Sequence, residues 1–301
     1  MPSLLDVRNR LEYALLRVLI GIVRLAPLDV AGNISALLWQ WIAPYGRRQR
    51  RALENIARAF PDMPDKERRR IIHAMWGNLG RVMVETMMID RVIADPKRID
   101  FISENVFRRY QGKMGPAVAM TLHMGNWELT AWPMTRTGWH AAAVYRLVKN
   151  PYADRYLREQ RKKIYPAGLL ARGQDYEGDD SEGQRTARRI MDFVRQGGRL
   201  GIVSDLYDRH GLKVPFFGTE AKSTMVPAMI ARRVGSRIWI ARCVRVGRAS
   251  RFKVEVKELK VAWTANAADD IRTTTAAAQA QFEAWIREVP EQWMWSNRRW
   301  S

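Results

Sequence analysis

The sequence predicts an α/β fold in which a mixed central sheet is flanked by helices and preceded by a helical N-terminal region. Residues 1–100 show mostly helical periodicity, with a helix start signal at Pro64-Asp65. From about residue 115, short apolar runs alternate with helical stretches, which is typical of an open sheet with helices on its faces. The length of 301 residues suits such a fold. We therefore expect a helical region at 1–100 and a single α/β core at 101–301.

The first predicted helix is amphipathic and basic. Within residues 4–26, apolar residues recur at helical spacing, whereas Arg10, Arg17 and Arg24 lie seven positions apart on the opposite face. Arg17 and Arg24 interrupt any run of the ~20 apolar residues that a membrane-spanning helix needs, and no signal-peptide cleavage pattern follows. The segment is therefore either a helix lying in a membrane interface or a core helix with a solvated basic face. The two tryptophans of the following "ISALLWQWIAPYG" favour the membrane, so we expect a membrane-associating anchor at about residues 4–45.

The elements of the predicted core follow in order along the chain. The acidic, Gly-rich stretch 172–183 predicts a connecting loop. Strands are predicted at 117–122, 141–145, 200–203 and 237–244, and a hairpin joins 238–246 to 252–261. A helix opens at Pro151 behind a capping Asn150, and further helices cover about 182–196, 223–234 and 268–288.

Composition narrows the possible partners. The chain carries 51 Lys and Arg against 31 Asp and Glu, and this net charge of +20 favours nucleic acid, anionic lipid or an acidic protein. The sequence contains no helix-turn-helix, aromatic RNA-binding motif or zinc finger, and a nucleic-acid-binding protein would leave the apolar N-terminus unexplained. With four scattered histidines, no H-E-x-x-H motif and one cysteine, Cys243, no metal site is expected. Cys243 lies in an apolar strand, where we expect it to be buried and inert.

The candidate chemistry lies where the predicted strands end. His123 follows the first strand, Arg146 the second and Asp205 the third. Ligands collect at the carboxyl ends of the strands in open α/β sheets. Adjacent parallel strands would therefore bring these three side chains to one edge.

The stretch "TLHMGNWELTAW" (121–132) places a lone histidine and a carboxylate five positions apart. On one continuous helix, His123 and Glu128 would diverge by about 140°. They can meet if His123 lies in the turn after the strand and Glu128 in the first helical turn, with Gly125 and Asn126 supplying the turn and the cap. An ionised Glu128 would then fix the imidazole tautomer and make a general base. The alternative is a structural histidine at a strand end.

"HMGNWE" resembles the H-x4-D/E motif of the lysophospholipid acyltransferase-like superfamily, and the chain resembles its lipid A late acyltransferase family of lauroyl and myristoyl acyltransferases. The likeness covers nearly the whole chain. In order, it includes "NIARAFP" with "NLGRVMVE", "VYRLVKNP" followed by Arg161, "SDLYDRHGLKVPFFGTEAKST" and "PEQWMWSNRRW". The family's Asp-Gln-Asp-like segment is "DLYD" here, so only Asp205 and Asp208 correspond. A sister branch that acylates mannosylated phosphoinositides shares the His-acid motif and stays an alternative.

The resemblance implies an O-acyltransferase with a His/Glu general-base mechanism. His123 would take the proton from an acceptor hydroxyl of a lipid A precursor, and that oxygen would attack the thioester of a fatty acyl carrier. Glu128 would orient the imidazole and stabilise its charge. The expected substrate-binding residues are Asn126, Arg146, Arg161 and Asp205.

The substrate-binding residues have different expected tasks. Arg146, together with Arg161, would hold an acceptor phosphate or the developing oxyanion, because a guanidinium fork suits either group. Arg161 lies in the basic helical stretch "LREQRKK" and is also consistent with a solvated helix charge. Asp205 would position a sugar hydroxyl or pair with an arginine.

The resemblance also implies partners and a location. No cofactor and no metal are implied, because acyl carrier protein or coenzyme A brings the acyl chain as a co-substrate. We expect acyl carrier protein, a glycolipid acceptor and a membrane surface with anionic lipids as partners, and no nucleic acid. The expected location is the cytoplasmic face of the bacterial inner membrane, as a peripheral or monotopic protein. A glycerolipid acyltransferase and a catalytically inactive membrane-bound scaffold are the remaining alternatives.

Overall fold

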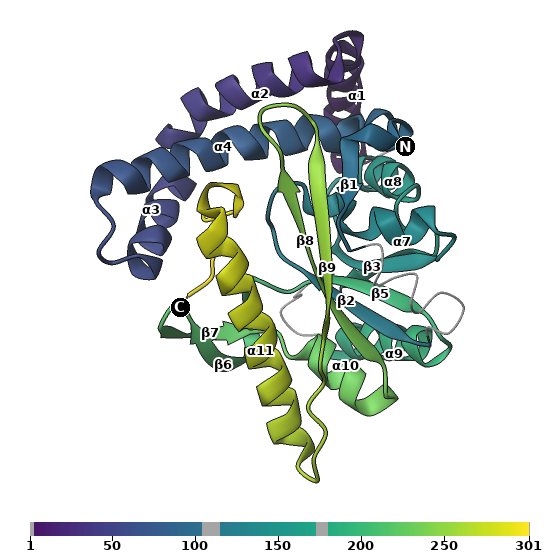
Figure 1. Cartoon of the computed structure of the whole chain (residues 1–301). Coiled ribbons are helices and arrows are strands. Elements are labelled where there is room, and N and C mark those ends of the chain that lie inside the picture. Colours follow the sequence, from purple (N-terminus) through teal and green to yellow (C-terminus); the bar gives the residue numbers. More distant parts are fainter. Residues whose placement is uncertain (1–2, 104–114, 173–179, 301) are drawn as a thin grey trace.

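The computed structural model describes residues 3–103, 115–172 and 180–300, and the first third of the chain is helical, as predicted (Figure 1). Ser3 caps the first helix by accepting a hydrogen bond from the Asp6 amide at 3.1 Å. The fourth helix begins at Asp65, directly after Pro64, where the sequence placed its start. The helices are α1 (Leu4–Leu25), α2 (Leu28–Ile42), α3 (Arg47–Ala59), α4 (Asp65–Met87) and α5 (Ile89–Ala94), with short 3-10 turns η1 (Ala43–Tyr45) and η2 (Pro96–Arg98).

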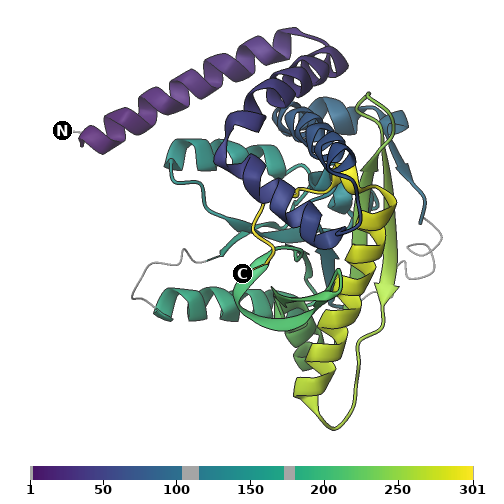
Figure 2. The same ribbon diagram turned by 90° about the vertical axis from the view of Figure 1, so that its left-hand side faces the viewer.

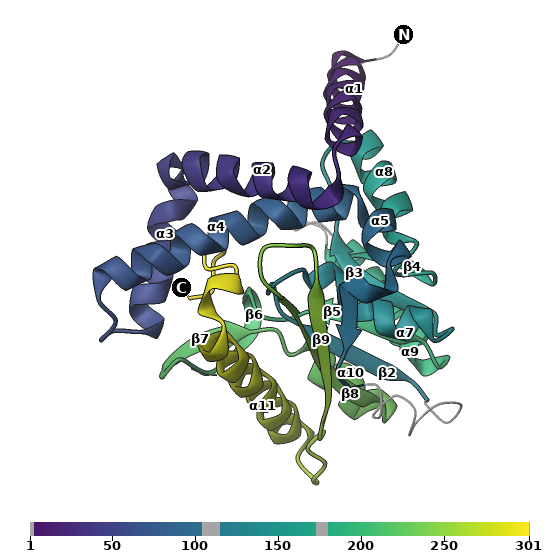
Figure 3. The same cartoon turned by 45° about the horizontal axis from the view of Figure 1, so that its top comes forward.

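Helices α2 and α4 lie side by side over one end of the molecule (Figures 1 and 3). They approach closely at Gly80 of α4, where a Cβ atom would lie 2.6 Å from the backbone oxygen of Ser35. The Ser35 hydroxyl donates to the Gly80 carbonyl oxygen at 2.8 Å. A glycine is therefore required at this contact, because any side chain would push the two helices apart.

The core of the chain is a seven-stranded sheet in the order β1-β9-β8-β2-β5-β3-β4. All neighbouring strands are parallel except β8 and β9, which form the predicted antiparallel hairpin. The strands predicted at 117–122, 141–145, 200–203 and 237–244 are confirmed, whereas β1 and β4 were not predicted. The bounds are β1 (Ile99–Phe101), β2 (Ala117–Thr121), β3 (Ala141–Arg146), β4 (Gly168–Arg172), β5 (Arg199–Val203), β8 (Arg237–Arg245) and β9 (Phe252–Leu259).

The predicted core helices are also present. Asn150 caps α8 through its side chain, and α10 ends at Gly235, which has a φ of 71°. Of the loop predicted at 172–183, residues 173–179 lie outside the described residues, and residues 180–183 belong to α9. A small two-stranded sheet was not predicted. The elements are η3 (Trp127–Ala131), α7 (Trp132–Arg136), α8 (Pro151–Arg161), α9 (Asp180–Arg195), β6 (Tyr207–Phe216), β7 (Thr219–Ser223), α10 (Val226–Val234), α11 (Ala267–Glu288) and η4 (Pro290–Gln292).

Both faces of the large sheet are covered, which explains why its strands read as continuous apolar runs. On β8, Ile238 and Ile240 face the cluster that contains Phe282 of α11, and the alternate residue Trp239 faces the opposite cluster. That opposite cluster also contains Met88, at the end of α4. On each face, the N-terminal helices therefore share a hydrophobic cluster with the sheet.

The surface of α1 and α2 is unusually apolar. Most of the large hydrophobic side chains that the structure describes as exposed lie between Leu4 and Tyr45, and they include Leu15 at 72% and Trp41 at 70% exposure. Within the described residues, no helix combines the length and the apolar character that crossing a membrane requires.

A buried ion pair joins the helical layer to the sheet. The carboxylate of Glu85 on α4 is fully buried and accepts hydrogen bonds from Arg245 Nη2 at 2.8 Å and from Ser250 Oγ at 2.8 Å. Arg245 lies at the end of β8, and its Nε donates to Asn78 Oδ1 of α4 at 2.9 Å. The contact leaves neither charge alone in the interior, which is the condition under which a buried pair is tolerated.

We predict that Arg245→Ala lowers the free energy of unfolding by about 3–5 kcal/mol, because Glu85 would stay buried without its counter-charge. Arg70→Ala is the matched control, since Arg70 pairs with Glu67 on an exposed helix surface. Its expected cost is about 0.2–1 kcal/mol. Urea unfolding of the two variants in detergent checks both values, and equal midpoints would show that the buried pair contributes little.

Candidate active site

The turn after β2 is built around Gly125, which has a φ of 56°. A Cβ atom there would lie 2.0 Å from the backbone oxygen of Cys243, so only glycine fits. The prediction that Gly125 supplies this turn is confirmed. Cys243 is fully buried, and burial raises the pKa of its thiol to about 12, so it stays protonated.

The C-terminal segment, residues 290–300, is hydrogen-bonded to the same turn. The Gly125 amide donates to the Gln292 carbonyl oxygen at 3.0 Å, and the Met294 amide donates to the His123 carbonyl oxygen at 3.0 Å. The segment itself is held by Asn55 of α3, whose side-chain amide donates to the carbonyl oxygen of Trp295 at 2.7 Å. The helical layer therefore positions the turn through the C-terminus.

His123 is paired with Asp205, the residue that follows β5. Strands β2 and β5 are parallel neighbours with Thr121 opposite Val203, so the positions two residues further on also lie level. His123 Nδ1 lies 2.8 Å from Asp205 Oδ1, and the His123 amide donates to Asp205 Oδ2 at 2.8 Å. The indole of Trp293 donates to the same Oδ2 at 2.7 Å.

The Asp205 carboxylate is fully buried and still ionised. Burial by itself would raise its pKa, but the attraction of His123 and the hydrogen bonds from His123 and Trp293 outweigh it, so the pKa lies below the usual value. An ionised carboxylate can only accept hydrogen bonds, so the proton of this contact belongs to His123 Nδ1. In the neutral imidazole this tautomer leaves Nε2 as the unprotonated nitrogen, which is the atom that can act as a base.

The predicted contact between Glu128 and His123 is not formed. Among the described residues, the hydrogen-bonding partner of Glu128 is Arg161, which comes from the end of α8. Glu128 lies in the short helix η3 and its carboxylate contacts Arg161 at the end of α8, whereas the imidazole of His123 contacts Asp205 after β5. The H-x4-E motif therefore contributes to two separate contacts, His123 with Asp205 and Glu128 with Arg161.

Arg161 is mostly buried and is not a solvated helix charge. Its side chain is 20% exposed, and the Glu128 carboxylate raises the pKa of the guanidinium despite the opposing effect of burial. Arg161 Nε is buried without a hydrogen-bond partner in the part of the chain that the structure describes. Such a cation can bind an oxyanion or a phosphate oxygen.

The other two predicted binding residues have different surroundings. Asn126 is fully buried, and its amide donates to Glu85 Oε2 at 2.9 Å, so it fastens the turn to α4 and has no exposed face for a substrate. It makes no side-chain capping bond to η3, contrary to expectation. Arg146 is exposed at the end of β3, which lies next to β5. The ends of the strands that lead to His123, Asp205 and Arg146 thus share one edge, as predicted.

Two residues near the C-terminus belong to this site and were not among the predicted site residues. Trp293 contacts Asp205 directly. Arg299 is fully buried, donates to Ser223 Oγ at 2.8 Å and to Gln279 Oε1 at 3.1 Å, and interacts electrostatically with Asp205. Burial lowers the pKa of Arg299 to about 10, so it stays charged at neutral pH and balances the buried carboxylate. Both residues lie in the "PEQWMWSNRRW" block, whose resemblance to the family was the signal that could have identified them.

Comparison with protein families places the whole chain in one of them. The family described as bacterial lipid A biosynthesis acyltransferase matches residues 2–301. Comparison with curated proteins gives no match. In the described residues, no group of three or more His, Cys, Asp or Glu side chains is arranged to hold a metal ion.

We predict that Gly125→Ala strongly destabilises the protein and abolishes the His123 site, because its Cβ would collide with the backbone of β8. Gly247→Ala is the matched control, since Gly247 has a similar φ of 67° but open space around it. The control carries only the conformational cost of about 1–2 kcal/mol. Thermal unfolding of both variants checks this, and equal melting temperatures would refute the collision.

Proposed function

Because the chain belongs to the bacterial lipid A biosynthesis acyltransferase family, we propose that it transfers a fatty acyl chain from an acyl carrier thioester to a hydroxyl of a lipid A precursor. The observation that carries the mechanism is the contact between His123 and the buried Asp205 at the carboxyl ends of β2 and β5. Acyl carrier protein or coenzyme A acts as the donor, and no cofactor takes part.

In this mechanism His123 Nε2 removes the proton from the acceptor hydroxyl. The oxygen attacks the thioester carbonyl carbon, and the tetrahedral oxyanion collapses as the C–S bond breaks. The leaving thiolate takes the proton back from the imidazolium. Asp205 stays ionised throughout, keeps the Nδ1–H tautomer and stabilises the imidazolium charge.

The ion pair of Glu128 and Arg161 is the second part of the proposed mechanism. Glu128 fixes the guanidinium from one side, and the exposed part of the Arg161 side chain is available to an oxyanion or an acceptor phosphate. Arg146 is exposed at the same sheet edge and can bind a second anionic group of the acceptor. Glu128 is therefore a positioning residue that acts through Arg161.

We propose that the protein works at the cytoplasmic face of the bacterial inner membrane, lying on its surface. The apolar side chains of α1 and α2 would enter the lipid interface, and the net charge of +20 would attract anionic head groups. The same charge would steer the acidic acyl carrier protein toward the site.

The test of the reaction is a transfer assay with purified protein, acyl carrier protein loaded with chains of different length, and a lipid A precursor. Mass spectrometry should show the gain of one acyl chain, absent with His123→Ala. Transfer to a mannosylated phosphoinositide instead would show that the acceptor is another phosphoglycolipid. No transfer to any acceptor from folded protein would refute the proposed activity.

The same assay distinguishes the proposed roles of Asp205 and Glu128. Asp205→Asn should lower kcat by about 10⁴, because the asparagine amide donates to Nδ1 and moves the imidazole proton to Nε2. Glu128→Gln should keep a hydrogen bond to Arg161 and lose less activity. Near-normal turnover with Asp205→Asn, in protein whose circular dichroism matches wild type, would contradict the proposed role of Asp205.

Membrane binding has its own prediction. Leu15→Glu combined with Leu19→Glu should weaken binding to anionic vesicles by tenfold or more. Each leucine side chain that is buried in the lipid would contribute about 1.5–3 kcal/mol to binding. Val246→Glu is the control, because Val246 is also exposed but lies in the turn between β8 and β9. Flotation with vesicles measures both, and an equal effect of the control would rule out α1 as the contact.

A further inference from the structure

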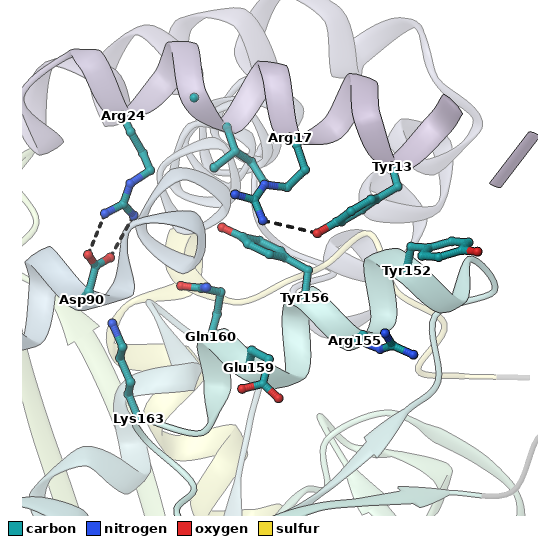
Figure 4. Close-up of a pocket in the computed structure, with 12 residues that line it drawn as sticks. Tyr13, Arg17, Arg24, Asp90, Tyr152, Arg155, Tyr156, Glu159, Gln160 and Lys163 are labelled. Atoms are coloured by element: carbon teal, nitrogen blue, oxygen red, sulfur yellow. Dashed lines mark hydrogen bonds and ion pairs between the residues drawn. The ribbon is translucent and has the colours of Figure 1, made fainter. Parts of the chain in front are cut away.

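A cavity of about 560 Å³ lies between α1 and α8 (Figure 4). One wall is the inner face of α1, with Tyr13, Arg17 and Gly21, and the other is α8 with Tyr156 and its neighbours. In Figure 4, Arg17 and Tyr156 point toward one another across the space. None of the lining residues belongs to the candidate active site, so the cavity is a separate feature.

The charges that line the cavity do not cancel. Arg24 is matched by Asp90, with Nη2 to Oδ2 at 2.6 Å, and Glu159 is matched by Lys162 at 2.6 Å. The remaining lining cations are exposed, and within the described residues no carboxylate lies at ion-pair distance from any of them. These cations are Arg17, Arg155 and Lys163. Asp90 also attracts Lys163 beyond ion-pair distance, so the excess of positive charge in the lining is greatest around Arg17 and Arg155.

Arg17 is held in place by neutral groups. Its Nη1 donates to the Tyr13 hydroxyl at 3.2 Å, and its guanidinium carbon lies 4.7 Å from the centroid of the Tyr156 ring. The aromatic contact orients the guanidinium and leaves its charge intact. A guanidinium with free donors, beside further cations and tyrosine hydroxyls, matches the oxygens of a phosphate group.

The opposite face of α1 indicates where that phosphate comes from. Leu15, Val18 and Ile22 are 72%, 59% and 60% exposed and lie on the face away from the cavity. Figure 2 shows α1 running along the outside of the molecule, away from the sheet. An amphipathic helix lies with its apolar face about 5–10 Å into the head-group and acyl boundary, so its polar face is level with the phosphates. A lipid head group can enter the cavity there.

We propose that the cavity between α1 and α8 binds the phosphate head group of an anionic membrane phospholipid through Arg17, Arg155 and Lys163. The head group would bridge α1 to α8, and α8 carries Arg161 at its end. Lipid binding would thereby fix the helix that supplies the active-site cation. The inference rests on the proposed membrane association and is independent of the proposed reaction.

The test titrates the full chain in neutral detergent with short-chain phosphatidylglycerol and follows binding by calorimetry. Arg17→Gln should weaken binding about fivefold, the equivalent of about 1 kcal/mol per cation near an anionic lipid. Arg8→Gln is the matched control, because Arg8 lies on the same helix, is exposed and does not line the cavity. An equal loss with Arg8→Gln would mean diffuse attraction and would overturn the proposal.

A second pair of variants tests the cavity without changing charge. A Cβ atom at Gly21 has no neighbour within 4 Å, so Gly21→Phe would fill the space and should weaken phosphatidylglycerol binding. Ala14→Phe places the same side chain at an exposed position of α1 outside the cavity and should leave binding unchanged. Undiminished binding by Gly21→Phe would refute the site.

Competitors identify the ligand. An equally charged carboxylate amphiphile should bind less tightly than phosphatidylglycerol, and inorganic phosphate should compete only at much higher concentration. Equal binding of the carboxylate, or competition by inorganic phosphate at the same concentration, would refute a phospholipid site. Loss of acyl carrier protein binding in Arg17→Gln, with lipid binding intact, would assign the cavity to the protein donor. His123→Ala should bind phosphatidylglycerol like wild type, which separates this result from the transfer assay.

Discussion

The buried carboxylate of Asp205 is the constraint around which the rest of this protein is arranged. An ionised group without solvent must receive hydrogen bonds and an opposite charge. His123 supplies its amide and its imidazole, and Trp293 supplies its indole. Arg299 adds a buried positive charge. These groups come from β2 and from the C-terminal segment, so the site forms only when the parallel sheet and the chain end are both in place.

The two carboxylates of the site have separate tasks that follow from their partners. Asp205 fixes the tautomer of His123, whereas Glu128 fixes the guanidinium of Arg161. The short turn at Gly125 keeps His123 and Glu128 close along the chain while directing their side chains to different elements, β5 and α8. In the proposed mechanism, a single H-x4-E motif in this way supplies a base and positions a cation.

The helical N-terminal region contributes to the site as well as to the surface. Glu85 of α4 holds Asn126 and Arg245, and Asn55 of α3 holds the C-terminal segment against the turn. The outer side of the same region is apolar on α1 and α2, and the inner side of α1 closes a basic cavity on α8. The helices proposed to meet a membrane are therefore packed directly on the elements that carry the candidate site residues.

The sequence by itself determined most of the secondary structure of the core, because the apolar runs of β2, β3, β5 and β8 and the caps of α8 and α10 are local signals. Residue order also placed His123, Arg146 and Asp205 at one sheet edge. It did not reveal β1 and β4, since a strand of three residues and a short edge strand owe their conformation to their neighbours. The sequence also could not show which carboxylate contacts His123 and which residue contacts Glu128. The partner of His123 depends on the register of β2 with β5, and the partner of Glu128 on the position of α8. Both are long-range contacts, which no spacing along the chain encodes.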